Sequence, residues 1–327
     1  MKRITYYLLP IALLLSACLS FGQQLPLNDQ YLINKFSLSP AYAGANDNYE
    51  TFMSFRRDWT GIQGAPETKG ININGALAKN MGIGGTITNE QIGIFKNLSA
   101  SLAYAYNLKL SSVQSLRIGL SGGFLDNHID LLGNKTSNQL DPVVLNYQDQ
   151  DATVFDASAG ILYSYQKLNI GVAIPHLIEN KIEEPRESLQ AGGPISILYT
   201  LQRQYNIHAS YSHNFNSNWQ IEPYAVVRKT MNSPLFYEVA SLIKYQQIWI
   251  GATYRKGNSF GASIGGVIYN KAVMNYTYEF SSNGMLANSS GTHEISIGFL
   301  LGKNKNNKSS IFNSNSSKQS YYQFIDK

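Results

Sequence analysis

The chain has 327 residues, enough for one large β-domain or two ordinary domains, and only 14% of them are charged. So few charges, together with 22 tyrosines and 27 glycines, favour a surface that meets lipid over the surface of a soluble enzyme. The formal charge of +5 comes from the two ends of the chain, and the nearly neutral remainder argues against a basic nucleic-acid-binding face.

The N-terminus has the pattern of a secretory signal peptide, predicted over residues 1–22. Lys2 and Arg3 supply its positive region, and Tyr6–Leu15 supplies an apolar stretch that is too short to span a bilayer. The small residues that follow suit cleavage by signal peptidase. Leu15–Cys18 also resembles a bacterial lipobox, in which Cys18 would accept a lipid, and both routes remain open. Because Cys18 is the only cysteine, an internal disulfide is excluded.

Residues 23–48 are predicted to form an N-terminal leader with little periodicity, ending in the turn-rich stretch Ser39–Gly44. From Thr51 to Leu301 the chain then alternates apolar residues with small or polar ones, most regularly in Leu98–Leu108. Since successive side chains of a strand point to opposite faces, each such segment carries one apolar and one polar face. Strands of this length and number, after an export signal, predict an outer-membrane β-barrel.

The alternating pattern divides into fifteen candidate strands. Bacterial single-chain barrels use an even number of strands, so one of these assignments is wrong. We therefore predict an all-β fold, an antiparallel transmembrane β-barrel over residues 49–302 with 14 strands, or 16 as the alternative. The candidates are Thr51–Asp58, Lys69–Leu77, Gly82–Asn89, Leu98–Leu108, Ser115–Leu125, Phe155–Tyr165, Leu168–Ile174, Pro194–Leu201, Tyr205–Phe215, Trp219–Lys229, Leu235–Tyr245, Ile248–Lys256, Phe260–Tyr269, Ala272–Phe280 and His293–Leu301.

Tight turns between neighbouring candidates also suit a soluble β-sandwich, which stays open as an alternative. The apolar face, however, carries many tyrosines near strand ends, as the aromatic girdles of a membrane barrel require. Examples are Tyr104, Tyr106, Tyr163, Tyr165, Tyr276 and Tyr278.

Two long insertions, Asp126–Val154 and Pro175–Gly192, follow odd-numbered candidates and are expected to face outward as long barrel loops. Ser281–Thr292 follows an even-numbered candidate, which suggests that the wrong assignment lies in the second half. Residues 303–327 are rich in Asn, Ser and Lys and are predicted to be a polar disordered tail.

The sequence predicts no catalytic, metal-binding or cofactor-binding residues. His208 and His213 lie an odd number of residues apart in one strand, so they face opposite sides and cannot form a simple metal clamp. Gly261–Gly265 matches the G-x-S-x-G pattern of hydrolases, but Ser263 lies within continuous strand alternation instead of on a strand-to-helix turn.

Three consecutive charges, Arg56, Arg57 and Asp58, precede Trp59 at the end of the first candidate strand. A charge on the lipid face is costly near mid-depth. We therefore expect these residues at the rim or in the lumen, where they pair internally or bind a partner.

Four segments, in the same order, resemble signatures of the PorP/SprF family. Ser39–Gly44 resembles its NPAYAG stretch, with Ser39 in place of Asn, and Arg56–Pro66 resembles R-x-x-W-x-G-x-x-G-A-P. Trp249–Arg255 resembles W-x-G-x-x-Y-R, and Thr292–Ile295 resembles S-H-E-I, with Thr292 in place of Ser.

The resemblance implies an outer-membrane component of the type IX secretion and gliding-motility system of a Gram-negative bacterium, without enzymatic activity or cofactor. It would aid export or surface anchoring of large adhesins by docking partner proteins. The matched residues are candidates for a structural or partner-binding role: Pro40, Tyr42, Gly44, Arg56, Arg57, Trp59, Gly61, Gly64, Pro66, Arg255, His293 and Glu294.

In this interpretation the two outward insertions meet an exported adhesin, while the leader or the tail meets the periplasmic secretion machinery. The alternative is an outer-membrane channel or transporter for small or hydrophobic solutes. The two differ in the lumen, which must be permeable in a channel and is expected to be largely closed in a docking barrel.

Overall fold

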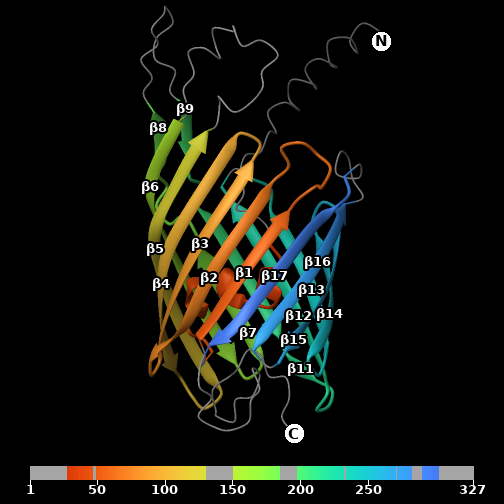
Figure 1. The fold of residues 1–327 in the computed structure, drawn as a ribbon. Helices are drawn as coiled ribbons and strands as arrows, with labels where there is room; N and C mark the ends of the chain where they lie inside the picture. The colour runs from red at the N-terminus through yellow and green to blue at the C-terminus, as the bar shows by residue number, and fades with distance from the viewer. Residues whose placement is uncertain are drawn as a thin grey trace, which may run out of the picture.

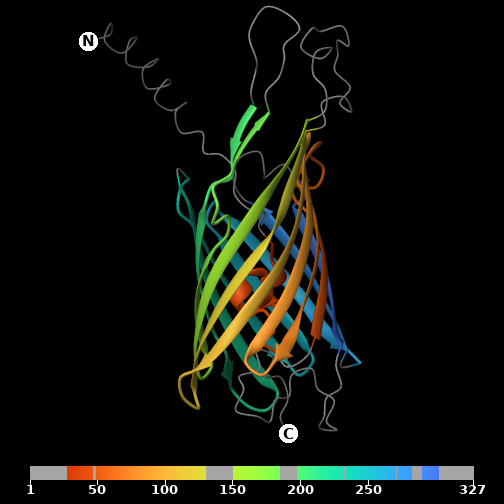
Figure 2. The same cartoon turned by 90° about the vertical axis from the view of Figure 1, so that its left-hand side faces the viewer.

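The computed structural model describes residues 28–46, 49–129, 150–184, 197–231, 233–269, 271–281 and 289–301. These residues form a closed antiparallel barrel of 14 strands around three short 3-10 helices, which confirms the predicted fold class (Figures 1 and 2). No helix in the described part of the chain is long and apolar enough to cross a membrane.

The elements follow one another around the barrel in chain order. The helices are η1 Gln30–Leu32, η2 Lys35–Ser37 and η3 Pro40–Tyr42. The strands are β1 Tyr49–Arg57, β2 Glu67–Ala78, β3 Met81–Ile92, β4 Phe95–Lys109, β5 Gln114–Ile129, β6 Gln150–Tyr165, β7 Leu168–Ile174, β8 Lys181–Glu184, β9 Ile197–Thr200, β10 Gln204–Tyr211, β11 His213–Asn214, β12 Trp219–Thr230, β13 Phe236–Tyr245, β14 Ile248–Arg255, β15 Ser259–Ile268, β16 Ala272–Ser281 and β17 Thr292–Leu301.

Two details of pairing bring the count to 14. Strands β10 and β11 are one barrel strand interrupted at Ser212, because both pair with β12. The barrel closes where β1 pairs with β17 from Tyr49 opposite Leu301 to Arg57 opposite His293.

The prediction of a barrel strand at Pro194–Leu201 is wrong. Within this segment β9 pairs only with β8, in a two-stranded sheet separate from the barrel (Figure 2). Alternation in so short a segment does not indicate which strand will be its partner, and the partner lies inside the predicted insertion Pro175–Gly192. Without this candidate, Ser281–Thr292 follows an odd-numbered barrel strand, as the other two insertions do. All three then start from the same end of the barrel, which resolves the conflict in the predicted order.

The two ends of the barrel differ in their connections. The long connections, between β1 and β2, β5 and β6, β7 and β10, and β16 and β17, all join strand ends on one side of the barrel, called here the long-loop end, which is uppermost in Figure 1. The other end, called the short-turn end, carries only brief connections such as residues 79–80, 166–167 and 246–247.

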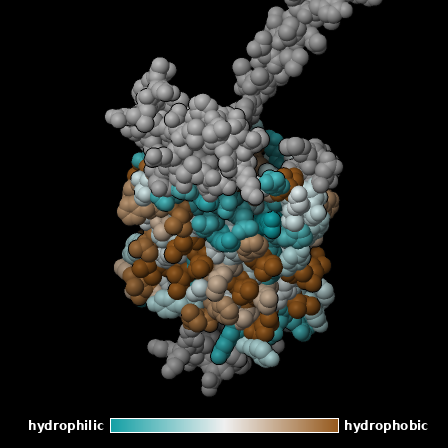
Figure 3. Space-filling model, turned by 45° about the horizontal axis from the view of Figure 1, so that its top comes forward, coloured by the Kyte–Doolittle hydropathy of each residue, from teal (hydrophilic) through white to brown (hydrophobic). Residues whose placement is uncertain are grey.

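The outer face of the barrel is apolar, as the alternation predicts. In β4, Leu98, Leu102 and Tyr104 are exposed on the outside, whereas Ala103 and Ala105 are buried toward the lumen. Apolar side chains gather over the outer wall in Figure 3, and polar ones near the long-loop end. The predicted tyrosines also face outward, as at a membrane interface.

The lumen holds residues 28–46, called here the plug, which contain η1, η2 and η3 (Figure 2). Pro40 occupies the first turn of η3, where its missing N–H costs nothing, and the Ser39 hydroxyl accepts a hydrogen bond from the Ala41 amide. Arg117 on β5 donates to the carbonyl oxygens of Ala41 and Ala43. These contacts satisfy backbone groups that burial would otherwise leave unpaired.

Glycines on one half of the wall allow the plug to approach closely. A Cβ atom on Gly82 of β3 would overlap the carbonyl of Ala43, and one on Gly119 of β5 would overlap Pro40 and Ala41. Gly44 has a φ of +58°, which favours glycine, and packs against the β2–β3 wall. The Ser39–Gly44 stretch is therefore fitted to the inside of the barrel.

We predict that Gly82→Ala destabilises the protein by about 1–3 kcal/mol, because the added methyl meets backbone that cannot move freely. Gly85→Ala on the same strand is the matched control, since its Cβ would lie 3.4 Å from the Leu102 side chain on the outside. Denaturant unfolding of the detergent-purified variants measures both. Equal unfolding free energies for the two variants would contradict the close fit of the plug.

Candidate functional site

The plug begins at a buried cluster of charges, called here the arginine cluster: Asp29, Arg56, Asp58, Glu238, Arg255, Glu279 and Glu294. Asp29 lies between two arginines, with Oδ1 2.7 Å from Nη2 of Arg255 and Oδ2 3.3 Å from Nη1 of Arg56. Its backbone amide also donates to Oε2 of Glu294 at 2.8 Å. Asp29 therefore joins the start of the plug to β14, β1 and β17.

The remaining contacts complete the network on the wall. Arg56 reaches Asp58 at 2.8 Å, Glu279 at 3.0 Å and Glu294 at 3.2 Å, and Arg255 pairs with Glu238 and Glu279. In this network each guanidinium nitrogen of Arg56 and of Arg255 has a carboxylate partner. Removing one partner of such a buried pair would leave an uncompensated charge.

Strand geometry explains why these residues meet. Arg56 and Glu294 are direct register partners on β1 and β17, and both side chains point into the lumen. Glu279, Arg255 and Glu238 lie at the long-loop ends of β16, β14 and β13. Each is thus brought to the same level of the lumen, although more than 200 residues separate Asp29 from Arg255.

A second cluster, called here the lysine cluster, holds the middle of the plug to β12 and β13. Oε1 of Glu222 lies 2.5 Å from Nζ of Lys35, and Oε2 lies 2.5 Å from Nζ of Lys244. All three side chains are buried, and the ammonium of Lys35 also lies 5.3 Å from the centre of the Tyr224 ring. One carboxylate therefore bridges a plug lysine and a wall lysine.

The predicted signature residues fall in three places. Pro40, Tyr42 and Gly44 belong to the plug, where the Tyr42 ring lies 5.5 Å from the His208 ring. Arg56, Arg255 and Glu294 belong to the arginine cluster. The other signature residues in the described part of the chain lie at the rim or on the outer face: Arg57, Trp59, Gly61, Gly64, Pro66 and His293. Cys18 lies outside the described residues.

The rim residues shape the loop that joins β1 to β2. Gly61 and Gly64 have positive φ values of +96° and +74°. The loop is tied to the segment before β17, because the Thr60 amide donates to the Gly291 carbonyl and the Ser290 amide donates to the Thr60 carbonyl, both at 2.7 Å. Pro66 accepts from the Asp58 amide at 2.9 Å, which closes the base of the loop.

In the Arg56–Pro66 and Thr292–Ile295 motifs, consecutive residues point to opposite faces of the barrel wall. Arg56 and Glu294 face the lumen, whereas Arg57 and His293 face outward. Nδ1 of His293 lies 2.7 Å from the Tyr276 hydroxyl on the outer wall. His293 and Glu294 therefore do not act in one site. Arg56 points into the lumen and pairs with Asp58, as expected, whereas Arg57 faces outward at the end of β1.

Sequence reasoning missed several members of the two clusters: Asp29, Lys35, Glu222, Glu238, Lys244 and Glu279. A signal for most of them was present, since each wall residue is an isolated charge on the polar face of an alternating strand. Asp29 and Lys35 carried no such signal, because the leader has no periodicity to show which side chains are buried.

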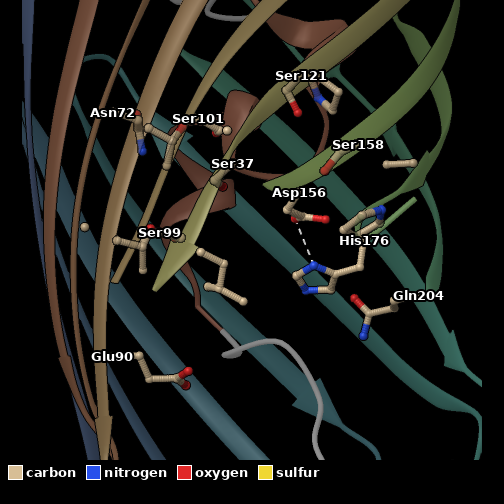
Figure 4. A pocket seen from close by; sticks show the side chains of 18 of the residues that line it. Ser37, Asn72, Glu90, Ser99, Ser101, Ser121, Asp156, Ser158, His176 and Gln204 are labelled. Atoms are coloured by element: carbon tan, nitrogen blue, oxygen red, sulfur yellow. Dashed lines mark hydrogen bonds and ion pairs between the residues drawn. The ribbon is translucent and has the colours of Figure 1, made fainter. Parts of the chain in front are cut away.

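A cavity of about 350 Å³ remains in the lumen between the plug and the wall (Figure 4). Hydroxyl and amide side chains dominate its lining, including Asn72, Ser99 and Ser101, and Nδ1 of His176 lies 2.9 Å from Asp156. Side-chain oxygens of Gln204 and Asn206 are buried there without a hydrogen-bond partner among the described residues. Such a lining favours water or another polar occupant over a hydrocarbon.

In the described part of the chain, no group of three or more metal-binding side chains converges. Ser263 is buried within continuous strand β15, away from any strand-to-helix turn, as predicted. His208 is buried and His213 exposed, which confirms that they face opposite sides.

We predict that Glu222→Gln lowers the free energy of unfolding by about 3–5 kcal/mol, because it leaves two buried ammonium groups without a counter-charge. Glu67→Gln is the matched control. It breaks an exposed pair with Lys69, which is expected to contribute at most about 1 kcal/mol. Denaturant unfolding in detergent compares them, and a Glu222→Gln variant as stable as Glu67→Gln would refute the role given to the lysine cluster.

Comparisons with known proteins identify the family. The chain matches none of the curated proteins. Among solved structures it is similar to the toluene transporter TbuX of Ralstonia pickettii, with 11% identity over 86% of this chain and 96% of that chain and a TM-score of 0.49. It is also similar to a FadL homologue of Pseudomonas aeruginosa, with 12% identity over 85% and 95% and a TM-score of 0.45.

Because both sequence identities and both TM-scores are low, neither similarity bears on function. The family described as type IX secretion system membrane protein PorP/SprF, in contrast, matches residues 20–299, nearly the whole chain. That match and the closed barrel make this an outer-membrane protein. The chain belongs to the PorP/SprF family of type IX secretion system membrane proteins.

Proposed function

We propose that this protein is a non-enzymatic docking barrel that aids the export or surface anchoring of large adhesins by the type IX secretion system. The observation that carries the proposal is the plug, which runs through the lumen and is tied to the wall by two buried charge clusters. A barrel so closed is suited to hold partners at its ends and poorly suited to conduct solutes.

The long-loop end offers the surface for an exported partner. The loop 58–66 is held in shape by hydrogen bonds to residues 290–292, and it presents Trp59 and Ile62 to solvent. Tryptophans on a fixed backbone are frequent anchors of protein interfaces. The strand ends that the insertions 130–149 and 185–196 connect also lie on this side of the barrel, whereas the insertions themselves are outside the described residues.

The alternative, a channel or transporter for small or hydrophobic solutes, has less support. A path through the lumen would have to pass the plug, where Pro40–Gly44 packs against wall glycines without space for a Cβ atom. The cavity beside the plug is lined mainly by hydroxyl and amide groups, which a hydrocarbon would leave unpaired.

Conductance in planar bilayers separates these two functions. We expect the wild-type barrel to pass little current and a variant lacking residues 28–45 to form a stable pore, because 14 strands enclose more space than their own side chains fill. The double variant Asp29→Ala, Lys35→Ala keeps the chain length unchanged. It should also conduct more current than wild type, because it removes the plug's ion pairs with the wall. A wild-type barrel that conducts as well as the deletion variant would overturn the docking proposal.

Deletion of the gene tests the secretion role directly, and the outcome expected is loss of large adhesins from the cell surface. Complementation with Trp59→Ala should restore much less adhesin than wild type, because loss of an anchoring tryptophan costs about 2 kcal/mol or more of binding. Trp219→Ala, at the short-turn end, is the matched control and should restore the wild-type amount. Normal secretion and retention in the deletion strain, with no paralogue compensating, would refute the proposal.

A further inference from the structure

The plug runs through the lumen in one direction, and both ends of its path are fixed by contacts. At its start, Asp29 pairs with Arg56 and Arg255, which lie at the ends of β1 and β14 where the long loops begin. At its finish, Gly44 packs against Gly75 and Gly82, on either side of the short turn 79–80. The chain therefore enters the lumen at the long-loop end and leaves it at the short-turn end.

The first strand then turns back. Tyr49 begins β1 at the short-turn end, and Arg57 ends it at the long-loop end (Figure 1). The plug and β1 thus form a hairpin-like path, and Asn28 lies at the level of the arginine cluster.

The plug is held against the wall on two sides of the lumen. On the glycine side, the plug touches the wall at Gly82, Gly119 and Gly160 too closely for even a methyl group. On the other side, Lys35 and Glu222 of the lysine cluster join the plug to β12.

We propose that the plug enters the barrel from the outer face of the membrane, so that Asn28 lies on the same side as the long loops. Long loops of outer-membrane barrels face outward and short turns face the periplasm, so the orientation follows from the loop lengths. The end of β17 at Leu301, in contrast, lies at the short-turn end. The start of the plug at Asn28 then faces the side of an exported partner and not the side of the periplasmic machinery, which changes one part of the docking mechanism. The topology itself depends on the barrel's orientation and not on the docking function.

Single-cysteine labelling of intact cells with a membrane-impermeant thiol reagent tests the proposal. Leu25→Cys reports on the leader, Gln63→Cys on the long-loop end and Lys79→Cys on the short-turn end. The wild-type chain, whose one cysteine is Cys18, gives the background. We expect Leu25→Cys to react on intact cells as fully as Gln63→Cys, and Lys79→Cys to react only after permeabilisation.

A Leu25→Cys thiol that reacts only after permeabilisation, or only after denaturation, would overturn the proposed topology. So would a Gln63→Cys thiol that fails to react on intact cells, because the long loops would then face the periplasm. Neither result depends on whether adhesins are secreted, so the topology and the docking function succeed or fail separately.

Discussion

The pairing of Asp29 with Arg56 and Arg255 is the interaction on which the rest of the structure depends. Both arginines are buried in the lumen, and their positive charges need carboxylates from the wall and from the plug. The barrel fixes the arginines, and the arginines fix the start of the plug. The plug in turn occupies much of a lumen that 14 strands cannot fill with their own side chains.

The two halves of the wall hold the plug by different physical means. Strands β2 to β6 present glycines and the hydrogen-bonding Arg117, so the plug backbone lies directly against them. Strands β12 to β17, with β1, present charged side chains that pair with Asp29 and Lys35. Shape fixes one side of the plug and charge fixes the other, so neither half alone determines its position.

The alternation of side chains was enough to predict the architecture, because lipid outside and a polar lumen inside impose it on every strand. It failed at Pro194–Leu201, where four residues pair outside the barrel. It also predicted nothing about the interior of the leader, which consists of 3-10 turns without a period. Its burial depends on residues such as Gly82 and Arg255, far along the chain, whose role appears only when the barrel closes.

Hydrogen exchange of the detergent-purified protein, followed by mass spectrometry, tests most directly the central claim that the plug is an integral part of the barrel. Peptides covering residues 28–45 should exchange as slowly as those of β1 to β4, because their amides are buried and many are hydrogen-bonded in the lumen. Exchange of these peptides within seconds, while the strands remain protected, would contradict the account and leave an open barrel with a loose leader.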